Sequence, residues 1–148
     1  MKNWKEIRAA IETHLVEQWV DADGNLRTPI QWENVVFDPD SENDVSALTA
    51  NKESFIRVTM IEDGVFKREL GDMPECSEYA GSMVIQVFTS AGIGPGEIAG
   101  MMSDVDAMLR AKVLDEDVYF EPHYRVVGKI NVGAWFLVTM EFPFTHAQ

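Results

Sequence analysis

The chain has 148 residues, of which 46% are hydrophobic and 10% aromatic, a composition that favours one globular domain and excludes a disordered chain. Its 25 acidic residues outnumber the 12 basic ones and give a formal net charge of −13. This charge repels the phosphate backbone and disfavours tight, sequence-specific binding of nucleic acid, although loose passage of DNA along an acidic wall stays open.

The single cysteine, Cys76, cannot form an internal disulfide, and no Cys/His cluster surrounds it. It is therefore expected to be an inert thiol in a protein made in a reducing compartment. Residues 1–12 lack the apolar stretch and cleavage site of a signal peptide. No apolar run approaches the roughly 20 residues that span a bilayer. We expect a soluble intracellular protein, or a part of a particle assembled inside a cell.

The first predicted element is an amphipathic helix over about residues 3–20. Asn3 and Glu6 have the spacing of a capping box, and apolar residues recur at steps of three and four. These apolar positions are Trp4, Ile7, Ile11, Leu15 and Trp19. The helix is expected to end near DADGN, residues 21–25, which has the composition of a turn. A short strand is predicted over residues 30–37.

Two polar segments, residues 38–53 and 62–78, are predicted to be exposed loops. The first lacks a helical or strand period over most of its length. Between the two segments SFIRVTMI, residues 54–61, alternates as a strand does. The second segment is charged, is broken by two glycines and a proline, and is a candidate for the extended tips of a hairpin.

A stronger strand, residues 79–89, runs into the glycine-rich sequence TSAGIGPGEIAG, residues 89–100, and a second amphipathic helix follows. The apolar positions of that helix are Ile98, Met101, Met102, Val105, Met108 and Leu109. We interpret its methionines as core residues, with an adaptable partner surface as the alternative. Two more strands are predicted over residues 118–127 and 134–142, and residues 145–148 are expected to fray.

The order α-β-β-β-α-β-β predicts an α+β fold with one domain, residues 1–148. Its sheet is expected to have about four to five mostly antiparallel strands, with the two helices packed on one face. The last strand is apolar on both faces. It is therefore either central and covered on both sides or part of an interface.

Strand, glycine-rich loop and helix is the layout of many phosphate-binding sites, but the details argue against one here. Gly92, Gly94 and Gly96 do not have the G-x-G-x-x-G spacing, because Glu97 stands where the third glycine belongs. The lysine of a P-loop is also missing. Glu97 lies in the first helical turn, where its carboxylate competes with an anion for the free amides. The loop is therefore predicted to be a structural turn.

No catalytic, cofactor-binding or metal-binding residue is predicted. DADGN resembles the start of an EF-hand, but Leu26 and Trp32 stand at the positions that need glycine and glutamate. The histidines His14, His123 and His146 have no ligand spacing, and His14 is expected to be partly buried in a structural role. Neither G-x-S-x-G nor H-E-x-x-H occurs. The chain is predicted not to be an enzyme.

The order of these segments resembles the tail terminator, or tail-to-head joining, proteins of long-tailed bacteriophages. After the N-terminal helix, the matching sequences are PIQWENVVF, SFIRVTMIE, YAGSMVIQVFTSAGIGPGEIAGMMSDVDAMLR and VGAWFLVTMEFPF. The most informative part is a strand with a V-x-V-F-like ending, followed by a G-x-G loop and an amphipathic helix. WENVVF before the polar loop is the second. Residues 62–78 match least well.

The resemblance implies a structural role in the virion. Such proteins form a six-membered ring on the end of the tail tube, stop tube polymerisation and offer a docking surface for the neck of the head, while DNA passes through the centre. For this chain it implies a homohexamer at the tail-neck junction, assembled in the bacterial host cytoplasm. The implied partners are other copies of itself, the tail tube protein and the neck or connector protein, without a membrane, a cofactor or sequence-specific binding of DNA.

Three other functions stay open from the sequence. The first is another neck, head-completion or tail-tube subunit. The second is a monomeric ligand-binding domain with a pocket between sheet and helices. The third is an enzyme, supported only by the glycine loop with Glu97 and Asp104 nearby. If the tail terminator interpretation holds, the two predicted loops, 38–53 and 62–78, are expected to carry contacts between subunits or between rings.

Overall fold

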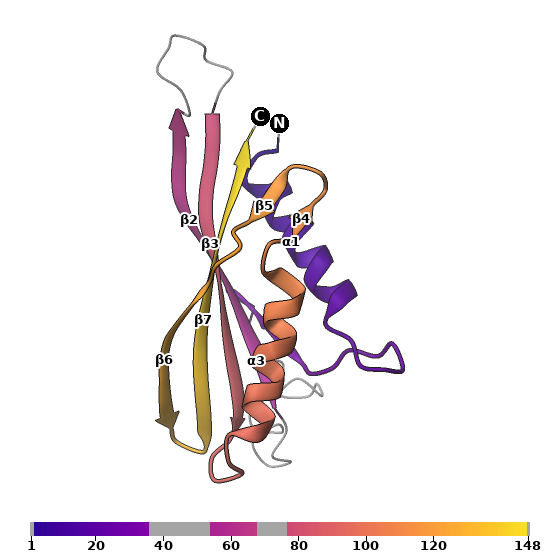
Figure 1. The fold of residues 1–148 in the computed structure, drawn as a ribbon, viewed down its shortest axis with the longest axis vertical. Helices are drawn as coiled ribbons and strands as arrows, with labels where there is room; N and C mark the ends of the chain where they lie inside the picture. Colours follow the sequence, from indigo (N-terminus) through magenta and orange to yellow (C-terminus); the bar gives the residue numbers. More distant parts are fainter. Residues whose placement is uncertain (1, 36–53, 68–76, 148) are drawn as a thin grey trace.

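The structure, a computed structural model, describes residues 2–35, 54–67 and 77–147. These residues form a seven-stranded sheet and two helices, α1 (Trp4–Gln18) and α3 (Gly96–Leu109), which lie on one side of the sheet (Figure 1). The strands are β1 (Ile30–Trp32), β2 (Phe55–Lys67), β3 (Ser77–Ser90), β4 (Val113–Leu114), β5 (Val118–Phe120), β6 (Arg125–Val132) and β7 (Trp135–Ala147). The predicted α+β class is confirmed.

The sheet is larger than the predicted four to five strands, and it is mixed. Its order is β1-β2-β3-β7-β5-β4, with β6 paired to β7 outside this path. The strand β1 runs parallel to β2, whereas the other pairs are antiparallel. The predicted sheet was too small for two reasons: β4, with two residues, carries too little periodicity to be recognised from sequence, and β5 and β6 were merged into one predicted strand.

The single strand predicted over residues 118–127 was wrong, because two strands occupy that region and the next. β5 ends at Phe120 and pairs with the C-terminal half of β7, whereas β6 begins at Arg125 and pairs with the N-terminal half. Pro122 lies in the break and has no N–H to donate to a ladder. One edge of the long strand β7 therefore pairs with two shorter strands, β5 and β6.

The strands β2 and β3 form a long antiparallel hairpin with a register from Phe55↔Phe88 to Lys67↔Ser77. They extend into the segment 62–78, which was predicted to be an exposed loop and a candidate for the tips of a hairpin, and the pairing confirms the hairpin over residues 62–67 and 77–78. A β-bulge between Glu62 and Gly64 absorbs one residue and lets the pairing continue through the charged stretch. The other predicted loop, residues 38–53, lies outside the described residues.

The helix α1 forms as the sequence predicts. The Asn3 side chain accepts a hydrogen bond from the Glu6 N–H (3.0 Å), and the Glu6 carboxylate accepts one from the Asn3 N–H (2.8 Å), which completes the capping box. Its apolar residues Ile7, Ile11 and Leu15 are fully buried. This stripe anchors the helix to the sheet, because burial of apolar surface stabilises the packed arrangement.

The main core lies between the helices and one face of the sheet. From the sheet it contains alternate residues of the three long strands, Ile56, Val58, Met60, Met83, Ile85, Val87, Val138, Met140, Phe142 and Phe144. From α3 it takes Ile98, Met101, Val105, Met108 and Leu109. The interpretation of the methionine stripe as core is thus confirmed for Met101 and Met108, while Met102 is half-buried.

A second, smaller cluster lies on the opposite face of the sheet, which we call the open face. Phe55 stacks on Phe88 with 4.4 Å between ring centroids, and Trp135 meets Phe55 edge-on at 5.1 Å. Leu137 completes the cluster. The strand β7 is therefore central in the sheet, and over this part its side chains are buried on both faces, in line with the first of the two alternatives that its apolar sequence left open.

The C-terminal residues do not fray as predicted. The strand β7 continues to Ala147, and the His146 side chain is only 1% exposed. Its Nδ1 lies 2.9 Å from the Asp117 carbonyl oxygen and its Nε2 accepts the Lys2 N–H at 3.0 Å. The Lys2 ammonium also contacts the Asp117 carboxylate at 2.7 Å. These bonds join the two termini, which lie side by side in Figure 1.

An ion pair between Arg8 of α1 and Glu33 makes the free energy of unfolding depend on pH in the acidic range. The guanidinium holds the pKa of the Glu33 carboxyl below its ordinary value of 4.5, helped by a weak hydrogen bond from the Met60 N–H. A depressed folded pKa contributes stability that is present above the unfolded pKa and is lost as pH falls through the folded one. Because the pair is about one-third exposed, its contribution is at most about 1 kcal/mol.

We therefore expect Glu33→Gln to flatten the fall of unfolding free energy below pH 4.5, as measured by urea denaturation from pH 6 down to pH 3. Arg8→Gln is the matched variant and is expected to flatten it in the same way. If both variants keep the parent's dependence on pH, Glu33 is not the group responsible.

Candidate functional site

The glycine loop is a tight turn that leads into α3, and the first turn of α3 is hydrogen-bonded to the residue before β2. Gly92 and Gly94 both have φ of +88°, a conformation that favours glycine. In the first turn of α3, the Glu97 carboxylate accepts a hydrogen bond from the Ser54 hydroxyl at 2.5 Å. The carboxylate of this first-turn residue is therefore held by the residue that precedes β2. The arrangement supports the prediction of a structural turn.

The cleft beside this loop has a volume of about 380 Å³. It is lined by Ser90, Gly92, Gly94, Pro95, Asn131 and Phe136. None of these lining residues is a lysine or arginine, the side chains that pair with phosphate. These described lining residues thus offer a phosphate no cationic partner, and the absence of a nucleotide site stays a prediction.

The sequence DADGN is also a turn, as expected. The Asp21 carboxylate accepts hydrogen bonds from the N–H groups of Asp23 (2.9 Å) and Asn25 (3.0 Å), which is the pattern of an Asx turn. Within the described residues, no group of three His, Cys, Asp or Glu side chains is placed to hold a metal ion. The same residues contain no helix that is long and apolar enough to cross a membrane.

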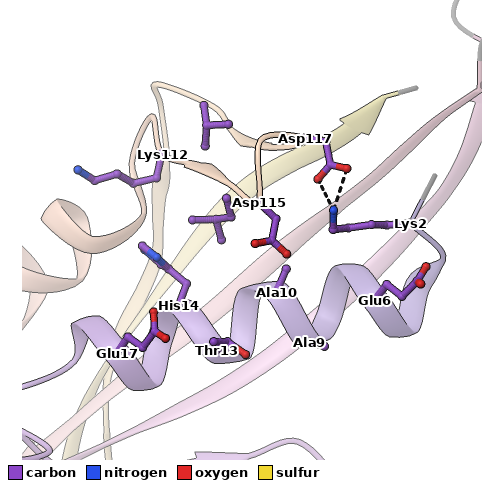
Figure 2. Close-up of a pocket in the computed structure, with 12 residues that line it drawn as sticks. Lys2, Glu6, Ala9, Ala10, Thr13, His14, Glu17, Lys112, Asp115 and Asp117 are labelled. Atoms are coloured by element: carbon purple, nitrogen blue, oxygen red, sulfur yellow. Dashed lines mark hydrogen bonds and ion pairs between the residues drawn. The ribbon is translucent and has the colours of Figure 1, made fainter.

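A groove of about 750 Å³ lies between α1 and the turn that joins β4 to β5 (Figure 2). Its polar lining includes Lys2, Glu6, Glu17, Lys112 and Asp115. In Figure 2 the Lys2 ammonium reaches across the end of the groove to the β4–β5 turn. The pKa of Lys2 is raised because Asp117 accepts hydrogen bonds from its ammonium.

His14 also lines this groove and contacts α3. Its Nε2 lies 2.8 Å from the carbonyl oxygen of Met108, near the end of α3. This is the partly buried structural role that the sequence predicted. Together with Lys2, His14 ties α1 to the rest of the protein. These are bonds that hold the fold, and they do not assemble a nucleophile with a base.

An exposed strand with apolar side chains, β6, lies at an edge of the sheet. All eight residues of this strand are exposed. Its apolar members, with exposures of 43–55%, are Val126, Val127, Ile130 and Val132. Among the described residues β6 pairs with β7 alone, so its outer side is unpaired. We call residues Arg125–Val132 the β6 edge.

A second exposed edge lies at the opposite edge of the sheet, in the distal part of β2. The strand β1 covers β2 only at Ile56–Val58, and Glu33 reaches the next outward group, the Met60 N–H. From Ile61 to Phe66 no described residue pairs with the outer side of β2. Ile61, Val65 and Phe66 of this segment are 44–55% exposed. We call residues Ile61–Phe66 the distal β2 edge.

Neither segment was predicted to be an exposed edge of the sheet. Residues 62–66 were predicted to be an exposed loop, with the extended tip of a hairpin as a candidate, and residues 128–132 were assigned to no element. A signal was present in RVVGKINV, residues 125–132, which is rich in the β-branched residues that favour strands. What the sequence does not reveal is that this apolar strand stays uncovered.

Comparison with known proteins places the chain in a family. A search of curated protein sequences found no match. One solved structure aligns over 100% of this chain and 97% of its own chain, with a TM-score of 0.68 and 16% sequence identity, so the likeness is one of fold. A family model described as phage tail terminator protein matches residues 6–131. This match spans most of the chain and agrees with the resemblance found in the sequence: the chain belongs to the phage tail terminator family.

Proposed function

We propose that this protein caps the end of the tail tube as a ring, stops the polymerisation of the tube and joins the tail to the neck of the head. The observation that carries the proposal is the family match over residues 6–131, which makes the chain a structural protein of the phage tail. In this proposal the ring is a homohexamer in the virion, assembled in the host cytoplasm. Its partners are the tail tube protein and a neck or connector protein.

The surface of the protein supports a ring. A cyclic ring needs two different patches on each subunit, one for each neighbour. The β6 edge and the distal β2 edge are two different surfaces of this kind, because they lie at opposite edges of one sheet. Exposed apolar strand edges favour association with another chain, and a protein that worked as a monomer would benefit from covering them.

The charge of the chain supports a passive path for DNA. Each subunit carries a formal net charge of −13, so a ring of subunits repels the phosphates of a passing duplex. Repulsion of this kind lowers the affinity for DNA of any sequence. In our proposal DNA moves through the centre without a binding site that would hold it.

The proposal is tested by electron microscopy of the purified protein mixed with tail tubes. We expect a ring-shaped cap at one end of the tubes, and we expect added protein to shorten the tubes when it is present during their polymerisation. Native mass spectrometry of the capped ends is expected to give six copies. Tubes that stay uncapped and grow to their usual length would contradict the proposal. Long tubes built from this protein itself would identify it as a tube subunit instead.

A further inference from the structure

We propose that neighbouring copies of this chain join by antiparallel pairing of the β6 edge of one copy with the distal β2 edge of the next. The proposal rests on the ring-forming function above and names the contact that would close the ring. Its occupant at each edge is a second copy of this chain. The exposure, direction, charge and stagger of the two edges all favour this pairing.

Among the described residues no further strand pairs with the outer side of either edge, and both edges carry exposed apolar side chains. The β6 edge has eight residues, all of them exposed, and the distal β2 edge has Ile61, Val65 and Phe66 at 44–55% exposure. A long apolar edge is a template for another strand, because its outer N–H and C=O groups lack partners within the sheet. Pairing the two edges would satisfy the backbone of both at once.

The strand directions fit an antiparallel junction. The strand β2 is antiparallel to β3, β3 to β7, and β7 to β6. Three reversals make β6 run opposite to β2 within one subunit. When two copies stand side by side in the same orientation, the β6 edge of one therefore runs antiparallel to the distal β2 edge of the other. The alternation of the sheet continues across the junction.

The charges on the two edges are complementary and lie on the same face of the sheet. Lys129 pairs in register with Val138, whose side chain lies in the main core, so Lys129 points to the helix side. Glu62 pairs with Gly81, which precedes Met83 by two residues in the same alternation, so Glu62 also points to the helix side. Opposite charges across neighbouring strands stabilise the pair. In a chain of net charge −13, a basic side chain on one edge is a specific feature.

Apolar side chains match on the open face. Ile130 pairs with Leu137 of the open-face cluster, so it points to that face. Ile61 pairs with Ser82 and has the same parity as Phe55 before the bulge, so it points there as well. Ile130 is 54% exposed and Ile61 is 44% exposed. A junction between the two edges would bury both against each other.

The two edges are staggered along the strands, which suits a closed ring. The β6 edge lies beside the N-terminal half of β7, where Val132 pairs with Trp135. The distal β2 edge lies at the other end, where β3 pairs with the C-terminal half of β7. In Figure 1 the end of β2 and the strand β6 stand at opposite ends of the molecule. Closing a sheet into a barrel requires such a stagger and gives strands that tilt relative to the axis.

The first test is a charge reversal and its exchange. Lys129→Glu and Glu62→Lys are each expected to reduce the fraction of protein found in rings on tail tubes by about tenfold, because a like-charge pair is repeated at every junction. The double variant Lys129→Glu with Glu62→Lys is expected to restore the rings. Lys112→Glu, which makes the same charge change in the groove beside α1, is the control and should form rings as the parent does. Thermal unfolding checks that every variant is folded.

The second test is cross-linking. Chains with Glu62→Cys are mixed with chains with Lys129→Cys, both with Cys76→Ser, on tail tubes in the presence of a short thiol cross-linker. Linked pairs of one chain of each kind are the expected result. Links between two Lys129→Cys chains would overturn the proposal in favour of pairing between two β6 edges.

The combined outcomes separate the two proposals. Normal caps on tubes, with no mixed links and no effect of charge reversal, would disprove the junction and leave the capping function intact. Mixed links in solution without any cap on tubes would support the junction and disprove the capping function. Mixed links together with caps that are lost on charge reversal would support both.

Discussion

Phe142→Ala is expected to lower the free energy of unfolding by about 3–5 kcal/mol, a large effect for a single substitution. Phe142 is 1% exposed and lies on the helix side of the central strand β7. Its ring stacks on Tyr124 with 4.8 Å between centroids. Truncation removes buried apolar surface and leaves a cavity that a sheet paired on both sides is poorly able to close. Urea denaturation followed by circular dichroism measures the change.

Phe66→Ala is the matched control, because it removes the same ring from a site that is 55% exposed. Its effect on the free energy of unfolding is expected to stay within about 0.5 kcal/mol. The same variant shortens the apolar surface of the distal β2 edge, so we expect it to weaken ring formation while the monomer stays stable. Equal losses of stability in the two phenylalanine variants would contradict the assignment of Phe142 to the core.

Gly81→Ala is expected to lower the free energy of unfolding by about 1–3 kcal/mol. A Cβ atom at this position would lie 2.5 Å from the Ile61 carbonyl oxygen and 2.8 Å from the ring of Phe144. The Phe144 side chain is packed in the core and has little room to rotate away. The Ile61 carbonyl belongs to the backbone of β2, beside the bulge at Glu62. Relief of the overlap therefore requires the hairpin to shift where the distal β2 edge begins.

Gly100→Ala is the control for this second prediction. Gly100 lies in α3 with nothing within 4 Å of an added Cβ atom. Alanine favours the helix over glycine, so this variant is expected to raise the free energy of unfolding by about 0.5–1 kcal/mol. Opposite signs for the two Gly→Ala changes, measured by urea denaturation, are the expected result. A gain or no change at Gly81 would show that the sheet adapts there at no cost.

The two predictions bear on assembly as well as on stability. The β-bulge at Glu62 and the close approach at Gly81 set the path of the hairpin end, and the hairpin end carries the distal β2 edge. A shift there changes the direction in which the edge points. We therefore expect Gly81→Ala to reduce ring formation more than its loss of stability explains, whereas Phe142→Ala reduces both together.

The sequence was sufficient for features that depend on neighbouring residues. The helix α1 was predicted with its capping box and its buried stripe, because a helix is made of contacts three and four residues apart. The turn at Gly92 and Gly94 and the start of α3 were likewise readable, since glycine, proline and glutamate act locally there. The family was recognisable because the order of elements extends over the whole chain.

The sequence was insufficient for features that depend on strand pairing. It predicted one strand over 118–127 where β5 and β6 pair with different halves of β7, and it left His146 in a frayed tail although that side chain is buried. It named the tips of a hairpin as a candidate for residues 62–78, but it did not predict the pairing that carries β2 through Glu62. Each of these depends on which distant residues become neighbours, and local periodicity carries no information on that.

The α+β class, the two helices with their buried faces, and membership of a tail terminator family all followed from the order of residues along the chain. The identity of the strands at the edges of the sheet followed only from the three-dimensional arrangement. RVVGKINV in β6 and WFLVTMEF in β7 both contain apolar residues that favour strands, yet β7 is central and β6 is exposed along its whole length. Hydrophobicity favours burial in either case, and the pairing of the sheet decides which strand is covered within one chain and which is left for another.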